Sequence, residues 1–313
     1  MKKLIVLFAT AVLLVSCSKN PAIDSETMLD GEKIFDPSLY APEKYLVSAA
    51  NPYPTEADLQ TPVIIAAHGY SATTFEWDEL RAWSREHGGF LLSQVLLGGH
   101  GRTYQEFKRS TWRDWQTPIL EEYQKLEQLG YRKISLLGSS TGCALMLELA
   151  ASRAFDGRQT PRHFIFIDPI VIPSDKLLSL VDFVGPMLGY TETSPTPEEE
   201  GRWYHYRPYE TLQQLNEVIN RVRKQLEAGV TLPDNARMKV YKAIKDPSAD
   251  PVSAVLIYKG VRTSNGGRID VKMVNTDLHV FTRLAGREKV TERDRRIQEE
   301  TFAEIRAMVL AQD

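Results

Sequence analysis

Cysteine is almost absent from this chain of 313 residues, which contains only Cys17 and Cys143. Two cysteines allow one disulfide at most, and the sequence has no Cys/His cluster with the spacing of metal ligands, so it implies no metal site. It also lacks a glycine-rich loop of the kind that cradles phosphates, and we therefore expect no cofactor. Stability must come from a hydrophobic core, and the length suits one large domain with an insertion.

The chain also lacks an excess of charge of one sign. Its 38 basic residues are balanced by 41 acidic ones, which gives a net charge of −3. No cluster of Lys and Arg is interleaved with aromatic residues, as nucleic-acid binding would require. The composition therefore argues against nucleic acid as a partner.

The apolar run at the N-terminus is too short to span a bilayer comfortably. Lys2 and Lys3 precede the apolar residues 4–15, which is typical of a secretion signal. The run ends in Leu14-Val15-Ser16-Cys17, which resembles the lipobox of bacterial lipoproteins. The resemblance implies that the signal is removed and that Cys17 carries a lipid anchor in the bacterial cell envelope. Ser18 follows the cysteine, which by analogy with enteric lipoproteins favours the outer membrane. A simple secretion signal with an incidental cysteine is the alternative.

Short apolar runs recur along the rest of the chain and predict the strands of a buried sheet. They cover residues 63–67, 90–97, 134–137, 164–167 and 240–244, and a further strand is plausible at 268–274. Helical spacing between and after them predicts helices over residues 75–86, 112–129, 141–153, 253–261 and 291–310. Because strands and helices alternate, the expected fold class is α/β, with a mainly parallel sheet and helices on both faces.

Residues 172–235 break this alternation. They contain a Pro-rich acidic stretch, an aromatic cluster at residues 203–206 and a helical pattern at 209–226. We interpret them as a helical cap above the carboxyl ends of the strands, where open α/β sheets bind ligands. The aromatic residues would line a pocket or form the core of the cap itself. The expected division is a signal peptide (1–16), a tether and lead-in (17–45), the first part of the core (46–171), the cap (172–235) and the second part of the core (236–313).

The pentapeptide Gly138-Ser139-Ser140-Thr141-Gly142 lies between a predicted strand and a predicted helix. In that context the pattern G-x-S-x-G predicts a nucleophile elbow, a sharp turn that needs small residues around the exposed serine. Ser140 is therefore the candidate nucleophile. A plain Gly/Ser turn at the start of a helix is the alternative interpretation.

A serine nucleophile needs a histidine base and a carboxylate that orients the base. His279 follows the last predicted strand, which is the position of the base in folds of this type. Asp250 is the preferred acid because it directly precedes a predicted helix. Asp246 lies in the same loop and is also suited to a turn with Pro247. Asp168, at the end of an earlier strand, is a third candidate.

An oxyanion hole would need two backbone N–H groups near Ser140. Thr141 follows the nucleophile at the start of a helix and offers one of them. The loop after the first strand offers the other at Tyr70, and Gly69 permits the tight turn there. His68 would then be structural.

These elements together resemble the carboxylesterase and monoacylglycerol-lipase branch of the α/β-hydrolases, which is also grouped with serine-aminopeptidase-like hydrolases. The matching segments are residues 67–70, 98–102, 112–115 and 129–134, the pentapeptide around Ser140, residues 250–252 and His279. The resemblance implies an α/β-hydrolase fold with Ser140 as nucleophile, His279 as base, Asp250 as acid and an oxyanion hole at Tyr70 and Thr141. Cys143 and Asp168 depart from the family, since relatives usually carry a glycine and a small residue there.

The sequence therefore predicts a lipid-anchored serine hydrolase that cleaves a carboxylic ester through an acyl-enzyme. A peptidase or a thioesterase with the same catalytic residues is the nearest alternative, because the triad is common to all three. A binding protein of the envelope that has kept the fold and lost the reaction is an alternative of another class.

Overall fold

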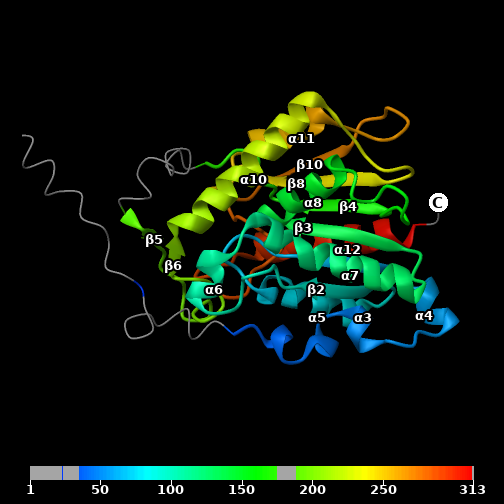
Figure 1. Cartoon of the computed structure of the whole chain (residues 1–313), viewed down its shortest axis with the longest axis horizontal. Helices are drawn as coiled ribbons and strands as arrows, with labels where there is room; N and C mark the ends of the chain where they lie inside the picture. Colours follow the sequence, from blue (N-terminus) through cyan, green and yellow to red (C-terminus); the bar gives the residue numbers. More distant parts are fainter. Residues whose placement is uncertain (1–22, 24–34, 175–187, 312–313) are drawn as a thin grey trace, which may run out of the picture.

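A six-stranded parallel sheet forms the centre of the computed structural model, which describes residues 23, 35–174 and 188–311 (Figure 1). The strand order is β10-β8-β4-β3-β1-β2, and every neighbouring pair is parallel. The strands are β1 (Val63–Ala67), β2 (Leu91–Val95), β3 (Ile134–Ser139), β4 (His163–Ile167), β8 (Arg237–Ala243) and β10 (Asp270–Val274). The α/β class and the mainly parallel sheet expected from the sequence are confirmed.

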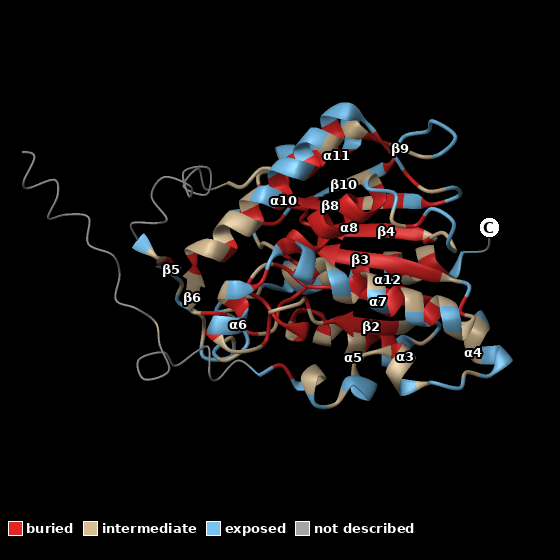
Figure 2. Ribbon diagram, in the orientation of Figure 1, coloured by how far each residue is buried: buried red, intermediate tan, exposed pale blue. Residues whose placement is uncertain are grey.

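The central strands β1, β3 and β4 are buried along their whole length because both faces of the sheet are covered, as Figure 2 shows. Successive residues point to opposite faces, so Val63 and Ile65 belong to one core and Ile64 to another. The first core packs against α7 (Trp112–Leu129), α8 (Thr141–Ala151) and α11 (Val252–Gly260). The second packs against α5 (Asp78–His87) and α12 (Glu292–Leu310).

Local capping sets where two of the long helices, α7 and α12, begin. Thr111 and Asp114 form a reciprocal capping box at the start of α7, and Thr291 and Asp294 do the same for α12. The predicted helix over residues 75–86 is split into a short turn, η3 (Thr74–Trp77), and α5. A further short helix, α6 (Tyr104–Arg109), precedes α7.

The described residues before β1 pack along the side of the sheet near β2. They form two turns, η1 (Pro37–Leu39) and η2 (Pro42–Lys44), and two short helices, α3 (Val47–Ala50) and α4 (Glu56–Gln60). Asp36 is buried, and its carboxylate accepts hydrogen bonds from the backbone and side chain of Thr74. The expected signal peptide, Cys17 and most of the expected tether lie outside the described residues.

The segment between β4 and β8 contains a small hairpin, β5 (Tyr190–Glu192) with β6 (Tyr206–Pro208), followed by the long helix α10 (Tyr209–Ala228). Figure 1 shows the hairpin and the start of α10 at the left end of the molecule. Val218, Ile219 and Val222 of α10 belong to the same core as the sheet, and a short pair of strands, β7 (Val230–Thr231) and β9 (Val261–Arg262), follows. The first turns of α10 thus lie near the hairpin, and the second half of α10 packs in the core. The expected cap boundaries, 172–235, stay a prediction.

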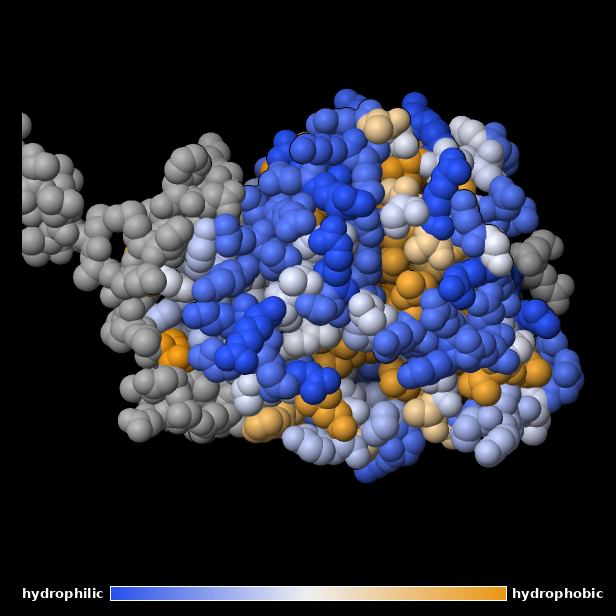
Figure 3. All heavy atoms as spheres, viewed as in Figure 1, coloured by the Kyte–Doolittle hydropathy of each residue, from blue (hydrophilic) through white to orange (hydrophobic). Residues whose placement is uncertain are grey.

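The surface shown in Figure 3 is mostly hydrophilic, with apolar side chains visible between charged ones. Among the described helices, none combines the length and the apolar character needed to cross a bilayer.

Candidate active site

Ser140 lies in the turn between β3 and α8 and has an unusual backbone conformation. Its φ of 47° and ψ of −112° lie outside the regions that residues with side chains normally adopt. Two glycines make the turn possible: a Cβ on Gly138 would lie 2.7 Å from the backbone nitrogen of Cys143, and a Cβ on Gly142 would lie 2.6 Å from the carbonyl oxygen of Ala67. The turn is so tight that only glycine fits at these two positions.

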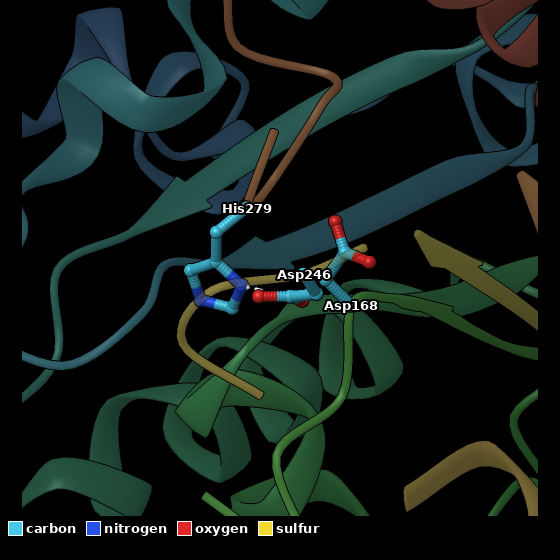
Figure 4. Close-up of side chains that lie close together, drawn as sticks. All are labelled: Asp168, Asp246 and His279. Carbon is cyan, nitrogen blue, oxygen red and sulfur yellow. Dashed lines mark hydrogen bonds and ion pairs between the residues drawn. The ribbon is translucent and has the colours of Figure 1, made fainter. Parts of the chain in front are cut away.

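His279 connects Ser140 to a carboxylate. It lies in the loop after β10, and its Nε2 is 2.9 Å from Oγ of Ser140. Its Nδ1 is 2.8 Å from Oδ2 of Asp246, which lies in the loop after β8. Figure 4 shows the imidazole turned toward Asp246, with a dashed line between the two. Both distances are those of hydrogen bonds, so three side chains from separate loops form one connected chain.

Asp246 is held in place by its own loop. Its Oδ1 accepts hydrogen bonds from the backbone N–H groups of Ser248 and Ala249, at 2.8 and 2.9 Å. Burial alone would raise the pKa of Asp246, but the hydrogen bond and charge of His279, with the nearby ammonium of Lys242, outweigh burial and lower the pKa to about 2. The ionised carboxylate therefore stabilises the fold above its ordinary pKa of 3.8, and this contribution is lost as the pH falls toward 2.

Asp250, the acid preferred from the sequence, does not reach His279, and that assignment is corrected to Asp246. The carboxylate of Asp250 accepts a hydrogen bond from the backbone N–H of Val252, at 2.8 Å, in the first turn of α11. A carboxylate at a helix start satisfies a free N–H group and interacts well with the helix dipole. Its position before a helix is explained by this local role.

Asp168 lies directly after β4, beside Asp246, but its carboxylate is hydrogen-bonded to groups other than His279. Its Oδ1 accepts hydrogen bonds from the backbone N–H of Ala243, at 2.7 Å, and from Nζ of Lys242, at 3.3 Å. Lys242 also donates to Oδ2 of Asp246, and the side chains of Lys242 and both aspartates are fully buried. One ammonium group therefore bridges two buried carboxylates.

Asp168, Asp246 and His279 bring ligand-type atoms within 4.8 Å of one another, which is close enough for a metal ion (Figure 4). The positive charge of Lys242 already lies between the two carboxylates, however, and it would repel a metal cation at that place. The arrangement is therefore better explained as an ion-pair cluster, in which Lys242 and Asp168 hold Asp246 in position, than as a metal site.

We expect Lys242→Met to lower the free energy of unfolding by about 3–5 kcal/mol, because it leaves two buried carboxylates without their shared cation. The double variant Lys242→Met/Asp168→Asn also removes one of the negative charges, so part of the loss should be recovered. Urea denaturation of the single and double variants at neutral pH measures this coupling. A double variant that is less stable than Lys242→Met would contradict the bridging role of Lys242.

The loop after β1 lies next to Ser140 and is tied to β3 by a buried glutamate. Oε1 of Glu76 accepts hydrogen bonds from the backbone N–H of Gly69, at 2.9 Å, and from the hydroxyl of Ser139. In the described part of the chain, the backbone N–H groups of Tyr70 and Thr141 have no acceptor, and both residues line the same pocket as Ser140. These two N–H groups stay the candidates for an oxyanion hole.

The other histidines have structural surroundings. His68 is buried, its Nδ1 is 2.8 Å from the carbonyl oxygen of Gly69, and its Nε2 accepts a hydrogen bond from the N–H of Leu97. Burial lowers the pKa of His68, which favours the neutral ring. His163 is buried in β4, where its Nδ1 is 3.2 Å from the hydroxyl of Ser135.

A pocket of about 650 Å³ lies above Ser140 and His279. Its walls are largely apolar and aromatic, and many of them come from the segment between β4 and β8: Ile170, Pro173, Leu188, Tyr190, Trp203, Tyr209, Leu212 and Leu215. The aromatic residues at 203–206 divide between the pocket and the main core of the sheet. Trp203 lines the pocket, whereas Tyr204 is fully buried and stacks on Phe107, with ring centres 4.1 Å apart.

Sequence reasoning missed several residues around this pocket. Glu76 accepts hydrogen bonds from Gly69 and Ser139, and Lys242 pairs with Asp246. Arg207 lines the pocket. Lys242 falls within the apolar run 240–244, which predicted a buried strand, and this was a usable signal because a buried lysine must find a carboxylate partner inside the protein.

No protein-family model matches the chain. Among curated proteins, it is 23% identical over 222 residues to a carboxylesterase of Bacillus subtilis (strain 168), which covers 70% of this chain and 85% of that protein. It is also 23% identical over 246 residues to a thermostable monoacylglycerol lipase of Bacillus sp. (strain H-257), which covers 77% of this chain and 91% of that protein.

Solved structures of lipolytic enzymes are similar in fold. A structure from a study of two metagenome-derived lipolytic enzymes, LipS and LipT, has a TM-score of 0.62 and 20% identity, covering 79% of this chain and 94% of that one. The monoglyceride lipase of Saccharomyces cerevisiae has a TM-score of 0.61 and 10% identity, with coverages of 82% and 88%. The chain therefore has the α/β-hydrolase fold, and its homologues and structural neighbours include carboxylesterases and monoacylglycerol lipases.

Proposed function

We propose that the protein is a serine hydrolase that cleaves carboxylic esters through an acyl-enzyme on Ser140. The observation that carries the proposal is the hydrogen-bonded chain from Ser140 through His279 to Asp246 at the base of a largely apolar pocket. The esterase and lipase relatives support ester hydrolysis as the reaction type.

In the proposed reaction, Oγ of Ser140 attacks the carbonyl carbon of the ester while Nε2 of His279 takes the hydroxyl proton. The tetrahedral intermediate then collapses, the bond from carbon to the alcohol oxygen breaks, and His279 gives its proton to the departing alcohol. Water repeats the same steps on the acyl-enzyme, which releases the carboxylic acid and restores Ser140. Asp246 keeps the proton of the neutral imidazole on Nδ1 and stabilises the imidazolium formed in each step.

The negative charge that develops on the carbonyl oxygen needs donors that are already in place. In this proposal the N–H groups of Tyr70 and Thr141 provide them. Glu76 would position the first donor, because it holds the N–H of the preceding residue, Gly69. Thr141 is the first residue of α8, so its N–H has no acceptor within the helix and gains from the helix dipole.

Covalent labelling tests the proposal. We expect a fluorophosphonate probe to add to the purified protein in a one-to-one ratio, and peptide mapping by mass spectrometry should locate the adduct on Ser140. The unlabelled protein should hydrolyse short-chain nitrophenyl esters and monoacylglycerols, and this activity should be lost once the probe has reacted. A protein that takes up no probe would support the inactive binding protein, and faster cleavage of aminoacyl amides or thioesters would favour the peptidase or the thioesterase.

We also propose that Cys17 is lipidated and anchors the protein in a bacterial cell envelope, with the outer membrane favoured. The support is the N-terminal sequence, in which Lys2 and Lys3, an apolar run and Leu14-Val15-Ser16-Cys17 follow one another.

A further inference from the structure

Arg207 is a cation in the pocket whose side chain makes no hydrogen bond or ion pair with the described residues. It lies on β6, opposite Thr191 of β5, and it lines the pocket together with Ser140. Its Nε is shielded from solvent and has no hydrogen-bond partner, and no carboxylate of the described residues forms an ion pair with it. Burial lowers the pKa of Arg207, which reflects the cost of keeping this charge away from water.

The other charged side chains of the pocket do not pair with Arg207. Arg283 pairs with Oε1 of Glu199 at 2.7 Å and donates to the carbonyl oxygen of Ala285. Glu76 is tied to the N–H of Gly69, and Glu192 is an exposed residue of β5 that makes no ion pair with Arg207. The guanidinium of Arg207 therefore stays available to a ligand.

The guanidinium of Arg207 lies against the ring of Tyr70 on the wall of the pocket that also contains Ser140. Its guanidinium carbon lies 5.8 Å from the ring centre of Tyr70, within cation–π range, and the backbone of Tyr70 is one of the two oxyanion-hole candidates. The hydroxyl of Tyr70 is 2.6 Å from the hydroxyl of Thr211 on α10, which fixes the ring. Arg207 is half-buried, and its shielded Nε without a hydrogen-bond partner is costly, whereas its planar fork matches a carboxylate.

We propose that the natural substrate is an ester that carries a carboxylate, and that Arg207 binds this carboxylate while the apolar walls hold the rest of the molecule. The inference rests on the proposed ester hydrolysis and specifies its substrate class. Because the carboxylate can lie in the acyl part or in the alcohol part of the ester, the test includes both.

Two matched pairs of esters test the inference. Monoethyl adipate and its carboxamide analogue place the charge in the acyl part, and 4-carboxyphenyl butyrate and 4-carbamoylphenyl butyrate place it in the alcohol part. We expect the wild-type protein to prefer the carboxylate member of one pair in kcat/KM. Arg207→Gln should reduce that preference by about ten- to a hundred-fold, as expected for the loss of a charge-assisted hydrogen bond.

Arg202→Gln is the matched control, because Arg202 is an exposed arginine nearby whose guanidinium lies over the ring of Phe75. It should leave the preference unchanged. A wild-type protein with no preference for either carboxylate ester, or an Arg207→Gln variant that keeps the preference, would overturn the inference.

Inhibition keeps the inference testable if Arg207→Gln does not fold. Benzoate should then inhibit hydrolysis of a neutral ester by the wild-type protein more strongly than benzamide does, and equal inhibition constants would overturn the inference. Absence of hydrolysis of every ester would contradict the proposed function instead. Calorimetric titration with benzoate and benzamide would in that case still decide whether the pocket binds a carboxylate.

Discussion

Replacing Ser140 with alanine is expected to lower kcat for ester hydrolysis by about a million-fold. The variant lacks the only atom of the proposed triad that bonds to the substrate, so acylation cannot occur. The fold should be unaffected, because the strained backbone at residue 140 is held by the tight packing of Gly138 and Gly142 and by the hydrogen bond from the N–H of Ser140 to the carbonyl oxygen of Ile167.

The measurement is the rate of release of nitrophenol from a short-chain ester, with the fluorophosphonate adduct followed in parallel. Ser152→Ala is a suitable control, since Ser152 is exposed at the end of α8, the helix that follows Ser140, and within the described residues its hydroxyl donates only to the carbonyl oxygen of Leu149. Both signals should persist in the control. Residual activity of Ser140→Ala within tenfold of the wild type would rule out the acyl-enzyme on Ser140.

Asp246→Asn is expected to lower kcat by about ten-thousand-fold, while Asp250→Asn should change it by no more than a few-fold. The asparagine amide can donate a hydrogen bond to Nδ1 of His279, which would place the ring proton on Nε2, where a base is needed. The substitution also removes the negative charge of Asp246, which stabilises the imidazolium of His279. Asp250 has neither role, because its carboxylate accepts a hydrogen bond at the start of α11.

The two variants form a matched pair, since they make the same chemical change four residues apart in one loop. Their activities on one neutral ester and their urea midpoints should be measured together, so that a loss of structure is separated from a loss of catalysis. If Asp250→Asn is the variant that loses activity while Asp246→Asn keeps it, the assignment of Asp246 is wrong.

The sequence predicted the sheet well because buried parallel strands are continuous apolar runs. Residues 63–67 correspond to β1 without change, and residues 112–129 to α7, whose start is set by a capping box visible in the sequence. The turn around Ser140 and the position of His279 were also predictable, because the glycine spacing and the order of the residues along the chain are dictated by the fold.

The acid could not be decided from the sequence. Asp246 and Asp250 follow the same strand, and the choice depends on how the loop turns after Ala243, the last residue of β8. The two N–H groups of Ser248 and Ala249 fold the loop around Asp246 and aim its other oxygen at His279. These hydrogen bonds form only in the folded loop, and no periodic pattern in the sequence indicates them.

Arg207 was missed for a related reason. A single arginine near an aromatic cluster is usually solvated, and its lack of a partner is a property of the folded pocket. Lys242 differs, since its place in a buried strand already indicated an internal ion pair.

The apolar walls of the pocket and its reacting residues come from different segments of the chain. Many of its apolar walls come from one stretch that includes β5, β6 and the first turns of α10, whereas Ser140, Asp246 and His279 come from the loops after β3, β8 and β10. Exchange of one continuous piece of gene by recombination can therefore alter which molecules enter, without disturbing the apparatus that cleaves them. A change of substrate range therefore needs no coordinated substitutions at codons far apart in the gene.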